Sequence, residues 1–203
     1  MTTFEKILKK YEGRTNYEGT DKNSLHSYGP VYDRIFEPIR ESVGAVLEIG
    51  VLSGASLVAL EEYFPNAIVY GIDINLSHLR YGIGRPKVVI QKMDGTLPET
   101  PTRLGQKFDL IIEDASHLPD HQVKSLDIFA DFLNPGGIYI IEDINGASEK
   151  SLQTRLKSVA DKHGLSMEWL DRRSVKNRYD DILAVFTRKS EDPNSSTARE
   201  FET

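Results

Sequence analysis

Carboxylate and imidazole side chains are concentrated in one stretch of this sequence, between Phe108 and His121. There a short apolar run ends in the pair Glu113-Asp114, and two histidines, His117 and His121, follow shortly after. The letters Ile-Ile-Glu-Asp of that run occur again at positions 140–143. Two carboxylates in contact in a site of reduced dielectric repel each other by roughly 1 to 4 kcal/mol. If both runs end at one edge of a sheet, their carboxylates need a cation or a shared proton between them.

Such a cluster is suited to binding a hard metal ion and to moving a proton. Carboxylates and water are natural ligands of Mg²⁺, and the chain has no cysteine to supply the softer ligands that favour zinc. A histidine, with an ordinary pKa of about 6.5, suits proton removal at neutral pH. We expect His117, three positions after Asp114, to act as general base, with His121 as a supporting or substitute base. Glu113 is expected to point away from Asp114, because side chains alternate along a strand.

The surrounding pattern predicts the α/β class. Short apolar runs alternate with segments of helical periodicity, which is typical of a mainly parallel sheet whose strand ends and loops lie along one edge. We expect strands at 45–49, 67–72, 87–91, 108–113, 137–141, 166–170 and 182–187. We expect helices at 53–63, 119–132 and 148–163, preceded by one that carries Phe4 to Tyr11 and one that starts near Pro30.

A glycine-bearing turn follows the first of these strands and reads Glu48-Ile49-Gly50-Val51-Leu52-Ser53-Gly54. Glycines let the backbone approach a ligand, and the free N–H groups of the following helix face whatever binds there. Asp73 ends the next strand, where a carboxylate can accept both hydroxyls of a ribose. The turn lacks the Gly-x-Gly-x-x-Gly pattern of dinucleotide-binding proteins, which counts against NAD but not against a nucleoside ligand.

Length and composition narrow the class of protein. The 203 residues suffice for one well-packed domain. A net charge of -6 argues against a nucleic-acid partner, because phosphate binding requires clustered Lys and Arg. The sequence has neither an N-terminal apolar signal core nor a run of about 18 apolar residues, so we expect a soluble, cytoplasmic protein without a membrane partner.

Four motifs together resemble the class I S-adenosylmethionine-dependent methyltransferases, over roughly residues 21–186. They are Val46-Leu47-Glu48-Ile49-Gly50 with Gly54, then Gly71-Ile72-Asp73, then Met93-Asp94-Gly95, then Leu133-Asn134-Pro135-Gly136-Gly137. The resemblance implies a Rossmann-like fold in a single domain, with a seven-stranded sheet, helices on both faces and a site for S-adenosylmethionine.

The same resemblance assigns cofactor-binding residues. It implies that Glu48, Gly50 and Gly54 line the methionine end, that Asp73 holds the ribose and that Asp94 lies near the adenine amine, and Ser56 joins this set. Leu52 departs from the family, whose first motif commonly has a small residue at that place.

Further residues resemble one subgroup, the Mg²⁺-dependent sugar O-methyltransferases of the macrocin, mycinamicin and rhamnosyl or mannosyl types. They are Thr20-Asp21-Lys22 with His26 and Tyr28, Asp114-x-x-His117, and Glu142-Asp143. By position, the resemblance implies that Asp114, Glu142 and Asp143 hold Mg²⁺. It also implies that the segment Asp21–Tyr28 closes over the cofactor or acceptor, although by composition this segment could be an ordinary loop.

Together these features predict a Mg²⁺-dependent O-methyltransferase that moves a methyl group from S-adenosylmethionine to a hydroxyl of a sugar or glycoside. Two alternatives stay open: the same chemistry on another small-molecule hydroxyl such as a catechol, and a non-catalytic nucleoside-binding protein. We expect N-terminal helices and a covering segment at 1–43, the S-adenosylmethionine-binding domain at 44–189 and a polar, disordered tail at 190–203. The short N-terminal region leaves little room for an auxiliary domain, so we expect a homo-oligomer in which a neighbouring subunit helps to bind the acceptor.

Overall fold

The computed structural model describes residues 2–13, 15 and 17–190, and a seven-stranded sheet runs through it in the order β3-β2-β1-β4-β5-β7-β6. The strands are β1 (Ala45–Ile49), β2 (Ile68–Asp73), β3 (Val88–Lys92), β4 (Phe108–Glu113), β5 (Leu133–Ile141), β6 (Leu165–Asp171) and β7 (Ile182–Arg188). Parallel pairing joins β3, β2, β1, β4 and β5, whereas β7 pairs antiparallel with both β5 and β6. The predicted Rossmann-like α/β fold with a mainly parallel seven-stranded sheet is confirmed.

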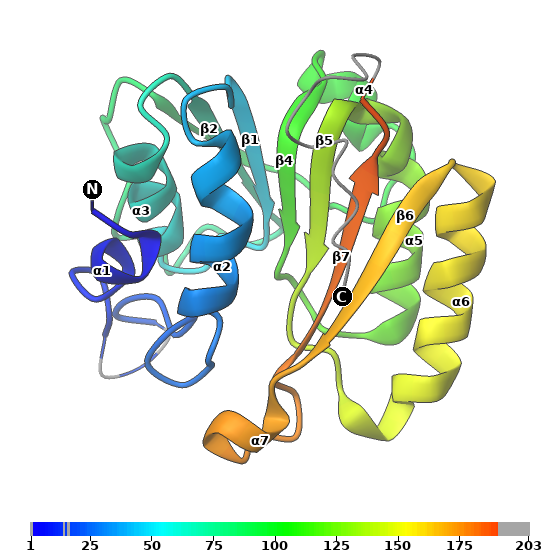
Figure 1. The fold of residues 1–203 in the computed structure, drawn as a ribbon. Coiled ribbons are helices and arrows are strands. Elements are labelled where there is room, and N and C mark those ends of the chain that lie inside the picture. The colour runs from blue at the N-terminus through cyan, green and yellow to red at the C-terminus, as the bar shows by residue number, and fades with distance from the viewer. Residues whose placement is uncertain (1, 14, 16, 191–203) are drawn as a thin grey trace.

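Helices cover both faces of this sheet (Figure 1). On one face lie α1 (Phe4–Leu8), α2 (Gly29–Phe36) and α3 (Ala55–Tyr63), and on the other lie α5 (Pro119–Phe129) and α6 (Glu149–Lys162). Two shorter helices, α4 (Thr100–Leu104) and α7 (Arg173–Lys176), stand in loops, and 3-10 turns span Glu37–Ile39, Ala130–Phe132 and Gly146–Ser148. Across the residues that the structure describes, no helix has the length and apolar character needed to span a membrane.

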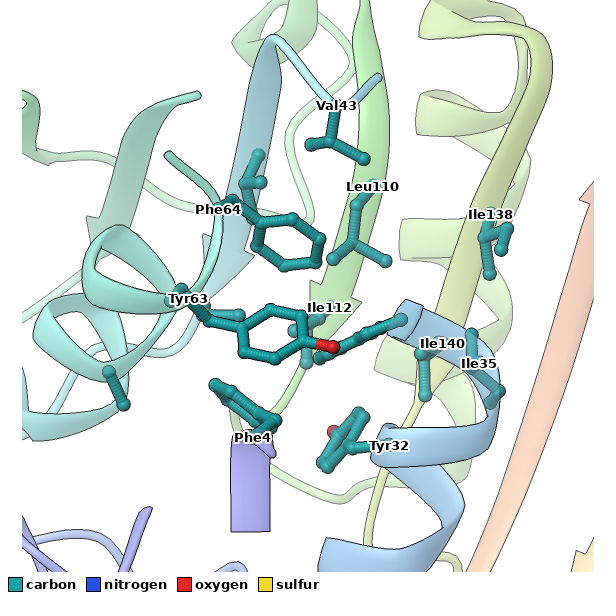
Figure 2. Close-up of a cluster of buried hydrophobic side chains, with 14 of the residues drawn as sticks. Phe4, Tyr32, Ile35, Val43, Tyr63, Phe64, Leu110, Ile112, Ile138 and Ile140 are labelled. Carbon is teal, nitrogen blue, oxygen red and sulfur yellow. The ribbon is translucent and has the colours of Figure 1, made fainter. Parts of the chain in front are cut away.

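Alternate residues of the central strands build two separate cores. Leu110 and Ile112 of β4, with Ile138 and Ile140 of β5, pack against α1, α2 and α3 through Phe4, Tyr32, Tyr63 and Phe64 (Figure 2). Ile111 of β4, with Tyr139 and Ile141 of β5, packs on the opposite face against Leu126, Phe129, Leu152 and Leu156 of α5 and α6. Each fully buried large apolar side chain contributes about 1.5 to 3 kcal/mol. The alternation of side chains along β4 therefore determines which face of the sheet each residue near the carboxyl end of β4 points to.

The carboxyl ends of β1, β2, β4 and β5 lie at one edge of the sheet, because these strands are parallel. In Figure 1 the N-terminal loops, drawn in blue, and α7, drawn in orange, gather at this same lower end. The chain segments before β1 and between β6 and β7 are thus placed beside the loops that follow β1 and β4.

Some boundaries differ from those predicted. β5 begins at Leu133, where it pairs with Phe108, and a register shift in the pairing of β4 with β5 accommodates Pro135-Gly136-Gly137 within β5. The helix predicted at 119–132 ends at Phe129 and continues as a 3-10 turn. Helices α4 and α7, of five and four residues, were not predicted. The tail predicted to be disordered lies, from residue 191 onward, outside the described residues.

Candidate active site

A cavity of about 620 Å³ opens at the carboxyl edge of the sheet. Its walls come from the N-terminal loop, the turn after β1, the end of β2, the loop after β3 and the loop after β4. The predicted site residues among its lining are Gly50, Ser56, Asp73, Asp94, Asp114, His117, His121 and Asp143, and Lys22 joins them.

The glycine turn after β1 is shaped by close backbone approaches. Gly50 has a φ of +95°, and a β-carbon there would lie 2.1 Å from the carbonyl oxygen of Asp114. Leu52, at the position where the family commonly has a small residue, has a φ of 47°. The N–H groups of Val51 and Leu52 donate to Asp73 Oδ2, at 2.9 and 3.1 Å. The end of β2 thereby holds the turn in this conformation and compensates part of the roughly 1 to 3 kcal/mol that a left-handed non-glycine residue costs.

The two carboxylates predicted to bind the nucleoside are both oriented by backbone N–H groups. Asp73 Oδ1 accepts from the N–H of Asn75 at 2.8 Å. Asp94 Oδ1 accepts from the N–H and the hydroxyl of Thr96, at 2.8 and 2.7 Å, and these hydrogen bonds lower the pKa of Asp94. Both side chains line the cavity.

Glu48 and Gly54, predicted to bind the cofactor, lie behind the cavity and do not line it. Glu48 is fully buried, accepts from the hydroxyl of Ser56 at 2.6 Å and has Oε1 3.4 Å from the Lys22 ammonium. Burial raises the pKa of Glu48 to about 7, against the pull of Lys22. Ser56 stands between this carboxyl group and the cavity, so Glu48 acts on the cavity through its neighbours.

The cation that the carboxylates require is present in the chain itself. The Lys22 ammonium lies 2.5 Å from Asp114 Oδ2 and 2.8 and 2.9 Å from the two Glu142 oxygens. Burial alone would lower the pKa of Lys22, but Asp114, Glu142 and Glu48 outweigh it and hold the pKa well above its ordinary value. The sequence alone does not assign this role to Lys22, because a single lysine in a polar loop has no periodicity and is only one letter of the motif Thr20-Asp21-Lys22.

Beside this lysine, three residues could hold a metal ion. Ligand atoms of Asp114, His117 and Asp143 all lie within 4.8 Å of one another. Glu142, the other predicted ligand, instead directs both oxygens at Lys22 and accepts from the hydroxyl of Tyr32. Asp114 thus has one oxygen on Lys22 and the other on His117, and it links the lysine to the candidate metal group.

His117 and His121 both line the cavity but have different surroundings. His117 Nε2 lies 3.1 Å from Asp114 Oδ1 and 3.7 Å from Asp143 Oδ2. Burial alone would lower the pKa of His117, but its hydrogen bond to Asp114 and the charges of Asp114 and Asp143 raise it to about 9. His121 Nδ1 instead lies 2.8 Å from the hydroxyl of Ser116. Of the two rings, the structure therefore couples only His117 directly to the carboxylates.

Backbone strain marks the same loops. His117 and Asp143 have φ values of 56° and 53°, in the left-handed region that most residues avoid. Burial and the neighbouring Asp114 raise the pKa of Asp143 to about 6, although His26, His117 and Tyr28 oppose this change. Strain of this kind persists where surrounding contacts hold it, and it is concentrated at functional sites.

Glu113 is buried and its Oε2 has no hydrogen-bond partner among the described residues. Burial raises the pKa of Glu113 to about 8. At neutral pH this side chain is therefore mainly a neutral acid, and it is absent from the group of residues whose ligand atoms converge. Glu113 nevertheless lines the same cavity as Asp114, so its expected orientation away from Asp114's side stays a prediction.

Comparison with known proteins shows what this arrangement is similar to. Residues 47–144 match the family model described as "Methyltransferase domain". This segment, just under half of the chain, is similar to methyltransferase domains. It contains the glycine turn, both nucleoside carboxylates and all the residues of the candidate metal group, whereas Lys22 lies before it.

The curated relatives that the chain matches are named as O-methyltransferases. The chain is 34% identical over 134 residues to the 8-demethyl-8-alpha-L-rhamnosyl tetracenomycin-C 2'-O-methyltransferase of Streptomyces olivaceus, a match that covers 62% of the chain and 35% of the relative. It is 36% identical over 129 residues to the demethylmacrocin O-methyltransferase of Streptomyces fradiae, covering 60% and 32%. The chain thus spans about a third of the length of the curated relatives it matches.

A solved structure shares the fold over nearly the whole chain. The MycE methyltransferase from the mycinamycin biosynthetic pathway, solved in complex with Mg and SAH, superposes with a TM-score of 0.71 at 23% identity. The match covers 94% of this chain and 56% of the other. The fold shared with that structure therefore extends well beyond residues 47–144.

Proposed function

We propose that this chain is an S-adenosylmethionine-dependent, Mg²⁺-dependent O-methyltransferase acting on a hydroxyl of a sugar or glycoside. The observation that carries the proposal is the convergence of Asp114, His117 and Asp143 at the edge of a nucleoside-sized cavity. The names of the curated relatives, among them a rhamnosyl tetracenomycin-C 2'-O-methyltransferase, support the acceptor class.

The cavity suits the methyl donor. In this proposal Asp73 holds the ribose hydroxyls and Asp94 the adenine amine, because both carboxylates are ionisable, oriented and exposed to the cavity. Gly50 and Ser56 line the methionine end, while Glu48 and Gly54 support that wall from behind. The N–H groups at the start of α3 add to the binding of a carboxylate.

The donor set also suits Mg²⁺, which takes oxygen ligands and keeps several waters. Asp114 and Asp143 present oxygens directly, and Glu142, the third predicted carboxylate, contributes by fixing Lys22 against Asp114. When bound, Mg²⁺ supplies Lewis-acid activation that lowers the pKa of a coordinated hydroxyl. The related solved structure of MycE contains both Mg and SAH, which supports the presence of both groups here.

His117 is proposed as the general base. In the metal-free protein its ring is held as a cation by Asp114 and Asp143, which raise its pKa. Neutralisation of Asp114 and Asp143 by a bound Mg²⁺ would remove their attraction for the His117 proton. The Nε2 atom of His117 would then be free to take the hydroxyl proton as the methyl group is transferred. His121, on the same cavity wall, is the substitute base.

We further propose a cytoplasmic homo-oligomer without nucleic-acid or membrane partners. In it residues 1–43 cover the site, residues 44–189 bind the cofactor, and a neighbouring subunit completes the acceptor site. The net charge of -6 supports the exclusion of nucleic acid. A catechol as acceptor is the second candidate, because vicinal hydroxyls of either class can chelate the same ion.

Turnover of labelled S-adenosylmethionine with a panel of glycosides and catechols tests the proposal. We expect glycosides to accept the label, EDTA to abolish turnover while cofactor binding persists, and added Mg²⁺ to restore it. His117→Ala should lower kcat by about 10² to 10⁴-fold. His163→Ala, which removes a histidine bound to Asp127 and Asp131 on the far helices, is the control and should keep full activity.

Other results would revise specific parts. Turnover that persists in EDTA without bound metal removes the ion from the mechanism. Label transferred to catechols alone replaces the acceptor class. Full activity of His117→Ala with loss of activity in His121→Ala moves the base to His121.

A further inference from the structure

Two buried tyrosines reach the acidic cluster from the start of α2. Tyr28 precedes the helix as its N-cap residue and Tyr32 lies one turn later, so both project from the same side of it. Both side chains are fully buried, and their rings meet edge to face at 6.4 Å. Each hydroxyl contacts one carboxylate of the pair after β5: Tyr28 contacts Asp143 and Tyr32 contacts Glu142.

The hydroxyl of Tyr28 contacts Asp143 at two points. It donates to Asp143 Oδ1 at 2.6 Å and accepts from the Asp143 N–H at 3.3 Å. His26 Nδ1 lies 3.3 Å from the same oxygen. One oxygen of Asp143 is thus occupied from the α2 side, and Oδ2 is left facing His117, toward the candidate metal group.

Asp143 depends on such contacts because its backbone is strained. Its φ of 53° lies in the left-handed region and costs roughly 1 to 3 kcal/mol unless neighbours hold it. A carboxylate that must offer one particular oxygen to an ion also needs its side-chain angle fixed. Tyr28 meets both requirements with one hydroxyl.

Glu142 is held more redundantly. Both of its oxygens are bound by the Lys22 ammonium, at 2.8 and 2.9 Å, and the hydroxyl of Tyr32 adds a further hydrogen bond. Removing the Tyr32 hydroxyl leaves the lysine in place. The two tyrosines are therefore alike in burial and helix position and differ in whether the carboxylate has another strong partner.

We propose that Tyr28 is a positioning residue of the metal site, which holds Asp143 in the orientation that binds the divalent cation. This inference rests on the proposed function and assigns a role within it to the segment before β1. Tyr28 does not line the cavity, whereas Asp143 does, so Tyr28 acts through Asp143.

Binding of Mn²⁺, as a spin probe for the Mg²⁺ site, separates this role from packing. Free Mn²⁺ is titrated by electron paramagnetic resonance in the full chain without cofactor or acceptor, for the unmodified protein, Tyr28→Phe and Tyr32→Phe. Loss of a hydrogen bond that orients a metal ligand typically weakens metal binding by about 10 to 100-fold. We expect a weakening of that size for Tyr28→Phe and a change of less than about twofold for Tyr32→Phe, with similar urea midpoints for both variants.

The outcomes are distinct. Equal Mn²⁺ affinity in the unmodified protein and Tyr28→Phe overturns the role of Tyr28 and leaves the proposed function standing. Equal weakening of Mn²⁺ binding in Tyr28→Phe and Tyr32→Phe also overturns it, because a change in packing would then explain both results. An unmodified protein that binds no Mn²⁺ overturns the metal-dependent function together with this inference.

A second variant serves if Tyr28→Phe does not fold. His26→Gln removes the ring nitrogen that faces Asp143 Oδ1 and retains the tyrosine. It should weaken Mn²⁺ binding by a smaller factor than Tyr28→Phe, because the hydroxyl continues to hold the carboxylate. Mn²⁺ affinity equal to that of the unmodified protein in His26→Gln would count against control of Asp143 from this segment.

Discussion

At the level of single residues, the site combines charged groups that are neutralised inside the protein. Lys22 and His117 together bring two positive charges to Asp114, which interacts with both. Burial alone would raise the pKa of Asp114, but these two cations lower it far below its ordinary value. Asp114 is therefore ionised at any physiological pH and is the carboxylate most ready to bind an ion.

Glu113 offers a test of the opposite situation, a buried acid without a cation in contact. Its pKa is raised from 4.5 to about 8, so between these values the folded protein holds a proton that the unfolded chain has lost. The contribution to stability is full below pH 4.5 and is lost as the pH rises toward 8. Glu113→Gln keeps the shape of the neutral acid and removes the titration.

Urea unfolding at pH 5 and pH 8 measures this effect. We expect the unmodified protein to lose more stability between the two pH values than Glu113→Gln does, by about 1 kcal/mol or more. The reason is that a pKa difference of one between the folded and unfolded states corresponds to about 1.4 kcal/mol. Glu41→Gln, at an exposed position, is the matched control and should behave as the unmodified protein. Parallel pH dependences in all three proteins would mean that Glu113 ionises normally.

At the level of elements, the turn after β1 and the loop after β4 fit together only because Gly50 has no side chain. A β-carbon at Gly50 would lie 2.1 Å from the Asp114 carbonyl oxygen, and the φ of +95° is unfavourable for other residues. Gly84 has a comparable φ of +76° but nothing within 4 Å of a built β-carbon. Comparing an alanine substitution at Gly50 with one at Gly84 therefore separates the cost of backbone strain from the cost of the steric clash.

We expect Gly84→Ala to cost about 1 kcal/mol of unfolding free energy, as is usual for a left-handed alanine. Gly50→Ala should cost roughly 1 to 3 kcal/mol more, the usual effect of overpacking. It should also weaken Mn²⁺ binding, because the clash displaces the loop that carries Asp114. Calorimetric melting and the Mn²⁺ titration check both effects. Equal stability of Gly50→Ala and Gly84→Ala would show that the loops after β1 and β4 can move apart without loss of unfolding free energy.

Elements with strong local patterns could be predicted from the sequence, whereas contacts between distant loops could not. The ends of β4 and β5 were identified because apolar runs stop at Glu113-Asp114 and Glu142-Asp143. Lys22, Tyr28 and Tyr32 contact those acids, which lie 92 to 120 residues further along the chain. The local pattern of residues 20–32 does not predict these contacts. These partners follow from the sheet order, which only tertiary packing determines.

At the level of the whole molecule, the connection between β6 and β7 fastens the segment that carries Lys22. The Lys176 ammonium, at the end of α7, donates to the carbonyl oxygens of Asn23, Ser24 and His26, at 2.5, 3.2 and 2.7 Å. Asp181, at the end of the same connection, accepts from the N–H and hydroxyl of Ser27. Residues 23–27 are thus held from the far end of the described chain.

Lys176→Met should loosen this attachment. We expect faster amide hydrogen exchange in residues 21–28, and a loss of about 1 kcal/mol in unfolding free energy, since a net hydrogen bond contributes about that much. Lys157→Met, which removes an exposed ion pair to Asp161 on α6, is the control and should leave exchange in residues 21–28 unchanged. Unaltered exchange of residues 21–28 in Lys176→Met would show that other contacts are enough to hold this segment in place.

The contacts of the Lys22 ammonium are expected to form late in folding, after the local elements. The ammonium joins residues 120 positions apart, and Tyr28 contacts the Asp180 carbonyl 152 positions away. Contacts so distant in sequence form slowly, because the chain must first lose the entropy of closing a long loop. A nascent chain that ends before β5 can pair β1 with β2, but it still lacks Glu142, which binds Lys22 with both oxygens. The candidate metal group therefore forms only after β4 and β5 have joined the sheet, because Asp114 and Asp143 follow those two strands.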